Sequence, residues 1–256
     1  MITARRYQKG NMAMSTSTIE RLTPNTVARI TGGCYLGFIL TSVLADRLGH
    51  IGLGGPQEMV QALTGNALAF RGAIAVVLIS ALLFLLSAWG LYVLLRPVHR
   101  GLALLFLLLN AVGVAIQCAS VFPLLSALLL GDGGSHMHAY SAAQLDGLAL
   151  VAAGTYKSGF AAAQLFYGTW LFPLGYLVYK SGSLPRLLGA LLLVDGVAVM
   201  VWFFQALLAP THHGIIVPGL AVSFVAEFGL SLWLLVRGVR PAGSTTVRLA
   251  EEGASL

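Results

Sequence analysis

Charged residues are scarce in this 256-residue chain. Asp, Glu, Lys and Arg together make up 9% of it, whereas about a quarter of a soluble globular domain is charged. Hydrophobic residues make up 57%, and the mean hydropathy is +0.85. This deficit is too large for a big soluble core to explain. The composition therefore excludes an ordinary soluble domain and indicates a helical membrane protein.

Sequence motifs for catalysis and for phosphate binding are missing as well. The chain has no GxSxG and no HExxH, and no Lys-Ser/Thr pair follows "GDGG" at 131–134 as a P-loop requires. Its two cysteines, Cys34 and Cys118, fall in apolar runs at different depths, so we expect no disulfide between them. The sequence thus names no reaction and predicts no cofactor.

What the sequence does contain is a series of long apolar runs. A run of about 20 residues can cross about 30 Å of hydrocarbon as a helix. The predicted fold class is therefore all-α, a polytopic membrane helical bundle. Six transmembrane helices are predicted, over about Ala28–Leu44, Gly72–Leu95, Leu102–Leu130, Phe160–Tyr179, Leu187–Leu208 and Leu220–Val236. The predicted divisions are a disordered basic leader at 1–27, the transmembrane domain at 28–238 and a disordered tail at 239–256.

The basic residues are distributed unevenly about these runs. Most lie before the first run, in the turns "RPVHR" and "KSGSLPR", and after the last run. The other side keeps Arg47, Arg71 and Lys157. Basic residues gather on the cytoplasmic side of membrane proteins. Both termini are therefore predicted to be cytoplasmic, and the positive net charge is better explained by membrane orientation than by nucleic-acid binding.

Two segments on the opposite side have helical character. Pro56 to Phe70 is predicted to form a short amphipathic helix on the membrane, ended or kinked near Gly65. A single helix over residues 140–180 would be about 60 Å long, twice the thickness of the hydrocarbon. A bend is therefore expected near Gly154 or Gly159.

Several short segments carry a resemblance to a known family. They are "RITGGCYL" (29–36), "FRG" (70–72), "LYVLLRPVHRGLALL" (91–105), "GYLVYKSGSLPRLLG" (175–189) and "AEFGLSLWLLVRG" (226–238). In this order they resemble the bacterial multi-pass membrane-protein family catalogued as domain of unknown function four-three-eight-six. The resemblance implies the fold and a bacterial cytoplasmic (inner) membrane, and it implies no reaction. It also places Glu227 where the family has a glutamate, and Asp195 where a small apolar residue is expected.

Two carboxyl groups fall inside apolar runs. Asp195 interrupts "LGALLLVDGVAVMVWFF" about 14 Å from the predicted cytoplasmic edge, and Glu227 lies about 12 Å from the outer edge. An ionised carboxylate at this depth is costly and faces the bundle interior or a water-filled cavity. Glu227 and Asp195 are therefore the candidate catalytic residues.

Other polar residues recur at helical spacing in three runs. We interpret them either as interhelical hydrogen-bonding groups or as a polar seam that binds a ligand. The stripes are Ser223, Glu227 and Ser231; Asn110, Gly113, Gln117 and Ser120; and Lys157, Gln164 and Gly168. The candidate ligand-binding residues are Asn110, Gln117, Lys157, Gln164, Ser223 and Glu227. The aromatic residues Trp170, Phe172, Tyr176, Trp202, Phe203 and Phe204 could line a lipid pocket, although core or lipid-facing positions are the favoured interpretation.

Histidines are concentrated on the predicted outer side. They are His50, His136, His138, His212 and His213, and Asp132 lies among them. Such groups could bind a transition metal. The short "HMH" and "HH" patterns lack the spacing of a known site, so no metal site is predicted.

Three functional classes remain open. The first is an accessory, sensory or lipophilic-ligand-binding membrane protein. The second is an intramembrane enzyme that uses a buried carboxylate as general acid on a lipophilic, isoprenoid-like substrate. The third is a proton-coupled small-molecule transporter, although no internal repeat supports it. The expected partners are the lipid bilayer and a lipophilic small molecule, not nucleic acid. A closed polar seam with no void would favour the first class, an apolar pocket that ends at Glu227 the second, and a water path through the bundle the third.

Overall fold

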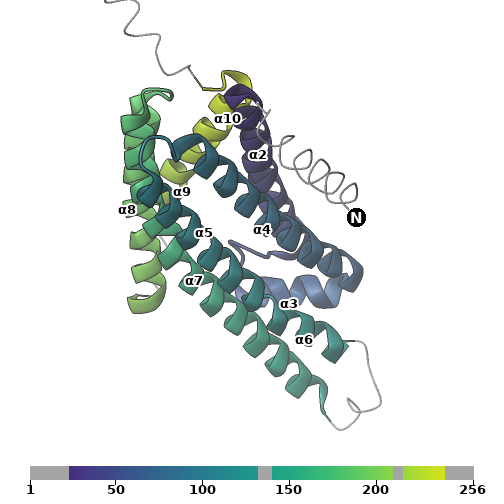
Figure 1. The fold of residues 1–256 in the computed structure, drawn as a ribbon. Coiled ribbons are helices and arrows are strands. Elements are labelled where there is room, and N and C mark those ends of the chain that lie inside the picture. The colour runs from purple at the N-terminus through teal and green to yellow at the C-terminus, as the bar shows by residue number, and fades with distance from the viewer. Residues whose placement is uncertain (1–22, 132–139, 210–215, 240–256) are drawn as a thin grey trace, which may run out of the picture.

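All regular secondary structure in the described residues is helical. The computed structural model describes residues 23–131, 140–209 and 216–239, and no strand occurs in these ranges. The elements are α2 (Pro24–Gly49), α3 (Pro56–Gly65), α4 (Ala67–Leu95), α5 (Arg100–Ser120), α6 (Phe122–Gly131), α7 (Ala142–Ser181), α8 (Arg186–Leu208), α9 (Ile216–Ser223), the π-helical turn η3 (Phe224–Phe228) and α10 (Gly229–Val236) (Figure 1). The all-α helical bundle predicted from the sequence is confirmed.

Much of the bundle is suited to a bilayer. Five of the described helical stretches are long and apolar enough to cross a membrane: Pro24–Gly49, Ala67–Leu95, Arg100–Leu129, Arg186–Leu208 and Pro218–Val236. They overlap five of the six predicted spans. The chain is therefore a multi-pass membrane protein, and the six-span count stays a prediction.

The remaining predicted span, 160–179, lies in α7. This helix is not among the five stretches. Polar residues such as Gln164 and Thr169 interrupt its apolar sequence. It contains 40 residues and continues through Gly154 and Gly159 without a break, where the sequence predicts a bend. The first proline within it is Pro173, so neither glycine is accompanied by a residue that removes a helical hydrogen bond.

Local sequence signals account for several helix ends. Pro24 occupies the first turn of α2, four residues before the predicted start of the membrane domain at residue 28. The α3 helix ends at Gly65, as expected, and the Asn66 side chain caps α4 by accepting a hydrogen bond from the Ala69 backbone at 3.0 Å. Ser141 caps α7 with a reciprocal Gln144 bond. These caps satisfy backbone donors that the helices leave free.

Four chain segments meet at one end of the bundle. The α4–α5 turn, the α7–α8 turn, the start of α2 and the end of α10 lie together at the top of Figure 1. The Val239 backbone nitrogen donates to the Asn25 side chain at 3.0 Å and so ties the last two of these segments together. These are the segments in which the sequence concentrates its basic residues. Their assignment to the cytoplasm stays a prediction.

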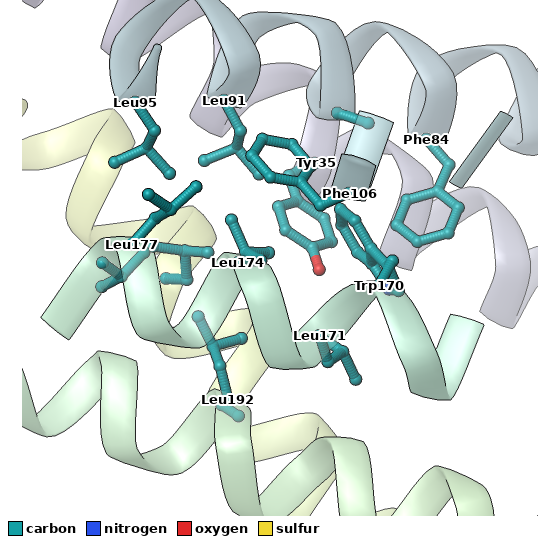
Figure 2. Packing of buried hydrophobic residues seen from close by; sticks show 14 of the residues in the cluster. Tyr35, Phe84, Leu91, Leu95, Phe106, Trp170, Leu171, Leu174, Leu177 and Leu192 are labelled. Atoms are coloured by element: carbon teal, nitrogen blue, oxygen red, sulfur yellow. The ribbon is translucent and has the colours of Figure 1, made fainter. Parts of the chain in front are cut away.

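The main core contains aromatic and leucine side chains from α2, α4, α5, α7, α8 and α10. Figure 2 shows Tyr35 lying among Phe106, Trp170 and Leu174. Trp170 is fully buried, with its ring edge-on to Phe84 at a centroid distance of 5.2 Å. A second cluster joins α3 and the adjoining ends of α4, α6 and α7. The two cores hold helices that would otherwise associate only weakly in lipid.

Candidate functional site

A cavity of about 600 Å³ lies inside the bundle. Its walls come from α2, α4, α5, α7, α8, α9 and η3, and from the loop at 50–55. This volume falls in the usual range for small-molecule sites, about 300–1,000 Å³. The residues that line it include Phe38, Ile39, Asp46, Arg47, His50, Phe84, Gln117, Phe160, Gln164, Tyr167, Trp202, Ser223, Phe224 and Glu227.

The cavity follows from the way in which two helices separate. α2 packs against α10 at the end where the chain termini of the bundle meet. Toward the opposite end, α2 and α9 diverge (Figure 1). Residues from both helices line the cavity, so the two helices face each other across it.

Glu227 lies at the inner end of the cavity. It belongs to η3, where the helix locally adopts the wider π form. Such turns are rare and are frequent at functional sites. Glu227 is half-buried and lines the cavity. The Tyr35 hydroxyl group lies close to the Glu227 carboxyl group. No described residue, however, is placed to form a hydrogen bond with the hydroxyl oxygen.

Asp195 lies behind the cavity wall. The Ser223 hydroxyl donates a hydrogen bond to one oxygen of its carboxyl group. Asp195 has no solvent exposure, and its other oxygen has no partner within the described ranges. Asp195 does not line the cavity, whereas Ser223 does. The two intramembrane carboxyl groups therefore have different surroundings: Ser223 bonds Asp195 behind the wall, whereas Glu227 itself lines the cavity.

Two glutamines add polar groups to the inner end. Gln117 accepts a hydrogen bond from the Tyr167 hydroxyl at 2.6 Å. Gln164 is 5% exposed and lines the cavity, and its side chain makes no hydrogen bond to another described residue. Gly113 makes room for the Tyr167 ring, since a Cβ there would lie 2.6 Å from Cε1 of Tyr167. The helices thus present amide and hydroxyl groups to whatever occupies the cavity.

The loop at 50–55 forms the other end of the cavity. Asp46 accepts hydrogen bonds from the backbone nitrogens of Leu53 at 2.9 Å and Gly54 at 3.2 Å. Lys157 donates from Nζ to the Gly52 carbonyl at 2.7 Å. Burial lowers the pKa of Lys157, which precedes the apolar part of α7, while Asp46 and Glu58 act in the opposite direction. These contacts hold the loop against α2 and α7.

The structure brings together four of the six candidate ligand-binding residues. Gln117, Gln164, Ser223 and Glu227 line the cavity. Lys157 instead holds the 50–55 loop.

Asn110 lies elsewhere in the bundle. It is fully buried away from the cavity, and neither of its side-chain polar atoms has a partner in the described structure.

Sequence reasoning missed Tyr167, Tyr35 and Asp46. Tyr167 lies three residues after Gln164, which places both on one face of a helix, so this spacing was an available signal. Of the six aromatic residues considered for a pocket, Trp202 lines the cavity, while Trp170 is in the core.

Of the residues considered for a metal site on the outer side, the structure describes His50. Asp132, His136, His138, His212 and His213 lie outside the described residues. His50 lines the cavity. Within the described ranges, no group of three His, Cys, Asp or Glu residues is arranged to hold a metal ion. Cys34 and Cys118 are free thiols on different helices.

Comparisons with known proteins place the chain in a family. A family model described as "Domain of unknown function (DUF4386)" matches residues 30–238. The chain belongs to this family. It is also similar to an uncharacterised protein of Archaeoglobus fulgidus, with 26% identity over 151 residues that cover 59% of this chain and 74% of the relative. No solved structure gives a significant match.

Proposed function

We propose that this member of the DUF4386 family binds a lipophilic small molecule in the cavity, within the bacterial cytoplasmic membrane. The observation that carries the proposal is a cavity of about 600 Å³ whose inner end is Glu227. Phe38, Phe84 and Trp202 supply apolar surface along it. A mostly apolar pocket with a few convergent polar groups is the usual form of a small-molecule site.

The orientation of the ligand follows from this arrangement. Its polar group lies against Glu227, Gln117 and Gln164, because buried polar groups need hydrogen-bond partners. Its apolar part extends between the diverging helices α2 and α9. A ligand dissolved in the bilayer can reach the cavity through that separation without crossing water.

The test fills the cavity without changing the fold. Ile39 lines the cavity, whereas the next residue, Leu40, does not line it and is 60% exposed. We expect wild type and Leu40→Trp in lipid nanodiscs to bind dodecanol saturably by calorimetry, beyond its uptake by empty nanodiscs. Ile39→Trp should weaken this binding by about tenfold or more, because the indole occupies the ligand's volume. Equal binding by the two tryptophan variants, or no saturable binding by wild type, would overturn the proposal.

The position of Glu227 on a π-helical turn favours a second candidate. Such turns are frequent at functional sites, and Glu227 would act as general acid on an isoprenoid-like epoxide. Its proton would pass to the epoxide oxygen as the carbon–oxygen bond opens. Water would then add to the resulting cation and return a proton to the Glu227 carboxylate. Mass spectrometry of a farnesyl epoxide incubated with wild type and Glu227→Gln tests this activity. Diol formed equally by both proteins excludes it.

A further inference from the structure

We propose that the ligand carries a basic nitrogen, and that its ammonium group binds Glu227 while its apolar part fills the cavity. This inference rests on the proposed function and names the class of ligand, a lipophilic amine. Three features of the inner end carry it: the sign of its charges, its free hydrogen-bonding groups and its aromatic surfaces.

The inner end of the cavity is acidic. Glu227 lines it, and Asp195 lies directly behind Ser223. Among the described residues, the basic side chains that line the cavity are Arg47 and His50, at the loop end. Arg47 is twelve residues from Tyr35 along α2, which corresponds to about 18 Å. An ammonium group would therefore reach Glu227 without competition from a protein cation.

An ammonium ligand also resolves an energetic problem of this site. An ionised carboxylate is costly inside a membrane, and the basic side chains that line the cavity, Arg47 and His50, belong to its loop end and not to the end at Glu227. A bound cation would offset that cost by pairing with it. A carboxylate ligand would bring a second acidic group to the same place, and an alcohol would supply no cation to pair with Glu227.

The Gln164 side chain also favours an ammonium ligand. Gln164 is more than nine-tenths buried, lines the cavity and bonds no other described side chain or backbone group. Its amide oxygen is available to accept a hydrogen bond. An ammonium group is a donor with no acceptor capacity, so Glu227 and Gln164 can both accept from it.

Aromatic rings surround this part of the cavity. Phe38 and Phe84 stack with a centroid distance of 4.2 Å, and Tyr167 lies edge-on to Phe84 at 5.2 Å. On the η3 side, Phe224 stacks on Phe228 at 5.1 Å. The faces of aromatic rings attract cations, most strongly where water is excluded. The cavity thus combines a carboxyl group with cation-binding surfaces.

The experiment compares three probes with the same chain and different head groups. They are dodecylamine, whose ammonium group carries three N–H donors, dodecanol and dodecanoate. Each is titrated into the full-length protein in nanodiscs of uncharged lipid, with empty nanodiscs subtracted. We expect the amine to bind wild type about tenfold more tightly than the other two, because charge-assisted hydrogen bonds are the stronger ones. Glu227→Gln should remove this preference, so that the amine binds that variant no more tightly than dodecanol does.

The outcomes separate this inference from the proposed function. Suppose that dodecanol binds saturably, that Ile39→Trp loses this binding, and that the amine binds no more tightly than dodecanol. This result overturns the assignment of an amine ligand and leaves the cavity as a site for other lipophilic molecules. Tighter binding of dodecanoate also overturns it. Absence of saturable binding for all three probes overturns both proposals. If Glu227→Gln does not fold, the comparison of the three head groups on wild type still tests the inference. Glu227→Asp, which keeps the carboxyl group, should retain the preference for the amine.

Discussion

The Ser223 hydroxyl donates a hydrogen bond to the Asp195 carboxyl group and so joins the segment before η3 to the middle of α8. Asp195 is fully buried, and its second oxygen has no partner in the described part of the chain. Ser223 also lines the cavity. The bond therefore connects a carboxyl group held by helix packing with the surface that a ligand would touch.

Replacing Ser223 with alanine should destabilise the bundle. The variant removes the described donor to a buried carboxyl group, which costs about 1–3 kcal/mol. The free energy of unfolding in mixed micelles measures the loss. Ser158→Ala is the matched control, because that hydroxyl is exposed and bonds the Gly154 carbonyl of its own helix. Equal losses in the two variants, or an Asp195→Leu variant as stable as wild type, would contradict a bonding role for Asp195.

Alanine substitutions at two adjacent glycines of α2 should affect stability differently. A Cβ at Gly32 would lie 2.5 Å from the Leu235 backbone nitrogen and 2.7 Å from the Ser231 carbonyl oxygen. Backbone atoms cannot rotate away, so Gly32→Ala should cost about 1–3 kcal/mol through overpacking. At Gly33 the nearest atom is a Leu235 methyl at 4.0 Å, so Gly33→Ala should be neutral or stabilising by up to about 1 kcal/mol.

Thermal unfolding of both glycine variants in one detergent provides the comparison. The midpoint of Gly32→Ala should fall below that of wild type, and the midpoint of Gly33→Ala should not. If the two variants unfold together, then α2 and α10 do not approach each other as closely as the structure places them.

The orientation of the chain can be tested at two loops. The 182–185 turn and the start of α2 lie at one end of the bundle, and the 50–55 loop forms the other end of the cavity (Figure 1). In a background with Cys34 and Cys118 replaced, an impermeant maleimide added to intact cells should label Leu53→Cys. It should label Ser183→Cys only after the cells are opened, since basic residues near that turn mark it as cytoplasmic. Labelling of Ser183→Cys in intact cells would reverse the predicted orientation.

The sequence predicted the parts of this structure that depend on local pattern. Apolar runs located the membrane helices, and the spacing of Ser223 and Glu227 placed both on one stripe, as in the structure. The cavity itself could not be predicted, because it depends on how far α2 diverges from α9. The π-helical turn at Glu227 was also missed, since "FVAEF" carries no proline or glycine to signal it.

Asn110 shows a second limit of periodicity. It shares a helical stripe with Gln117, yet only Gln117 reaches the cavity. Seven residues of helix separate them by about 10 Å along the axis. A stripe gives the direction in which a side chain points but not the depth at which the neighbouring helices separate. Periodicity therefore grouped side chains on common helix faces, but two of the six candidates, Asn110 and Lys157, do not line the cavity.

Gly113 should control the shape of the inner cavity through Tyr167. A methyl group at Gly113 would lie 2.6 Å and 2.8 Å from two carbons of the Tyr167 ring. The ring must move, and its hydroxyl then separates from Gln117, which it now meets at 2.6 Å. Gly113→Ala should therefore weaken amine and dodecanol binding by about fivefold to tenfold and lower stability by about 1–3 kcal/mol.

Two further variants separate the movement of the ring from the loss of its hydroxyl. Tyr167→Phe deletes the hydroxyl but keeps the ring in place, so it should cost about 1 kcal/mol of stability and leave dodecanol affinity nearly unchanged. Gly147→Ala is the control for an added methyl group, because nothing lies within 4 Å of a Cβ there. It should bind dodecanol as wild type does, and its stability should equal that of wild type or exceed it by up to about 1 kcal/mol. If Gly113→Ala binds dodecanol as wild type does while Tyr167→Phe does not, the hydroxyl rather than the ring position governs the site, and the role assigned to Gly113 is wrong.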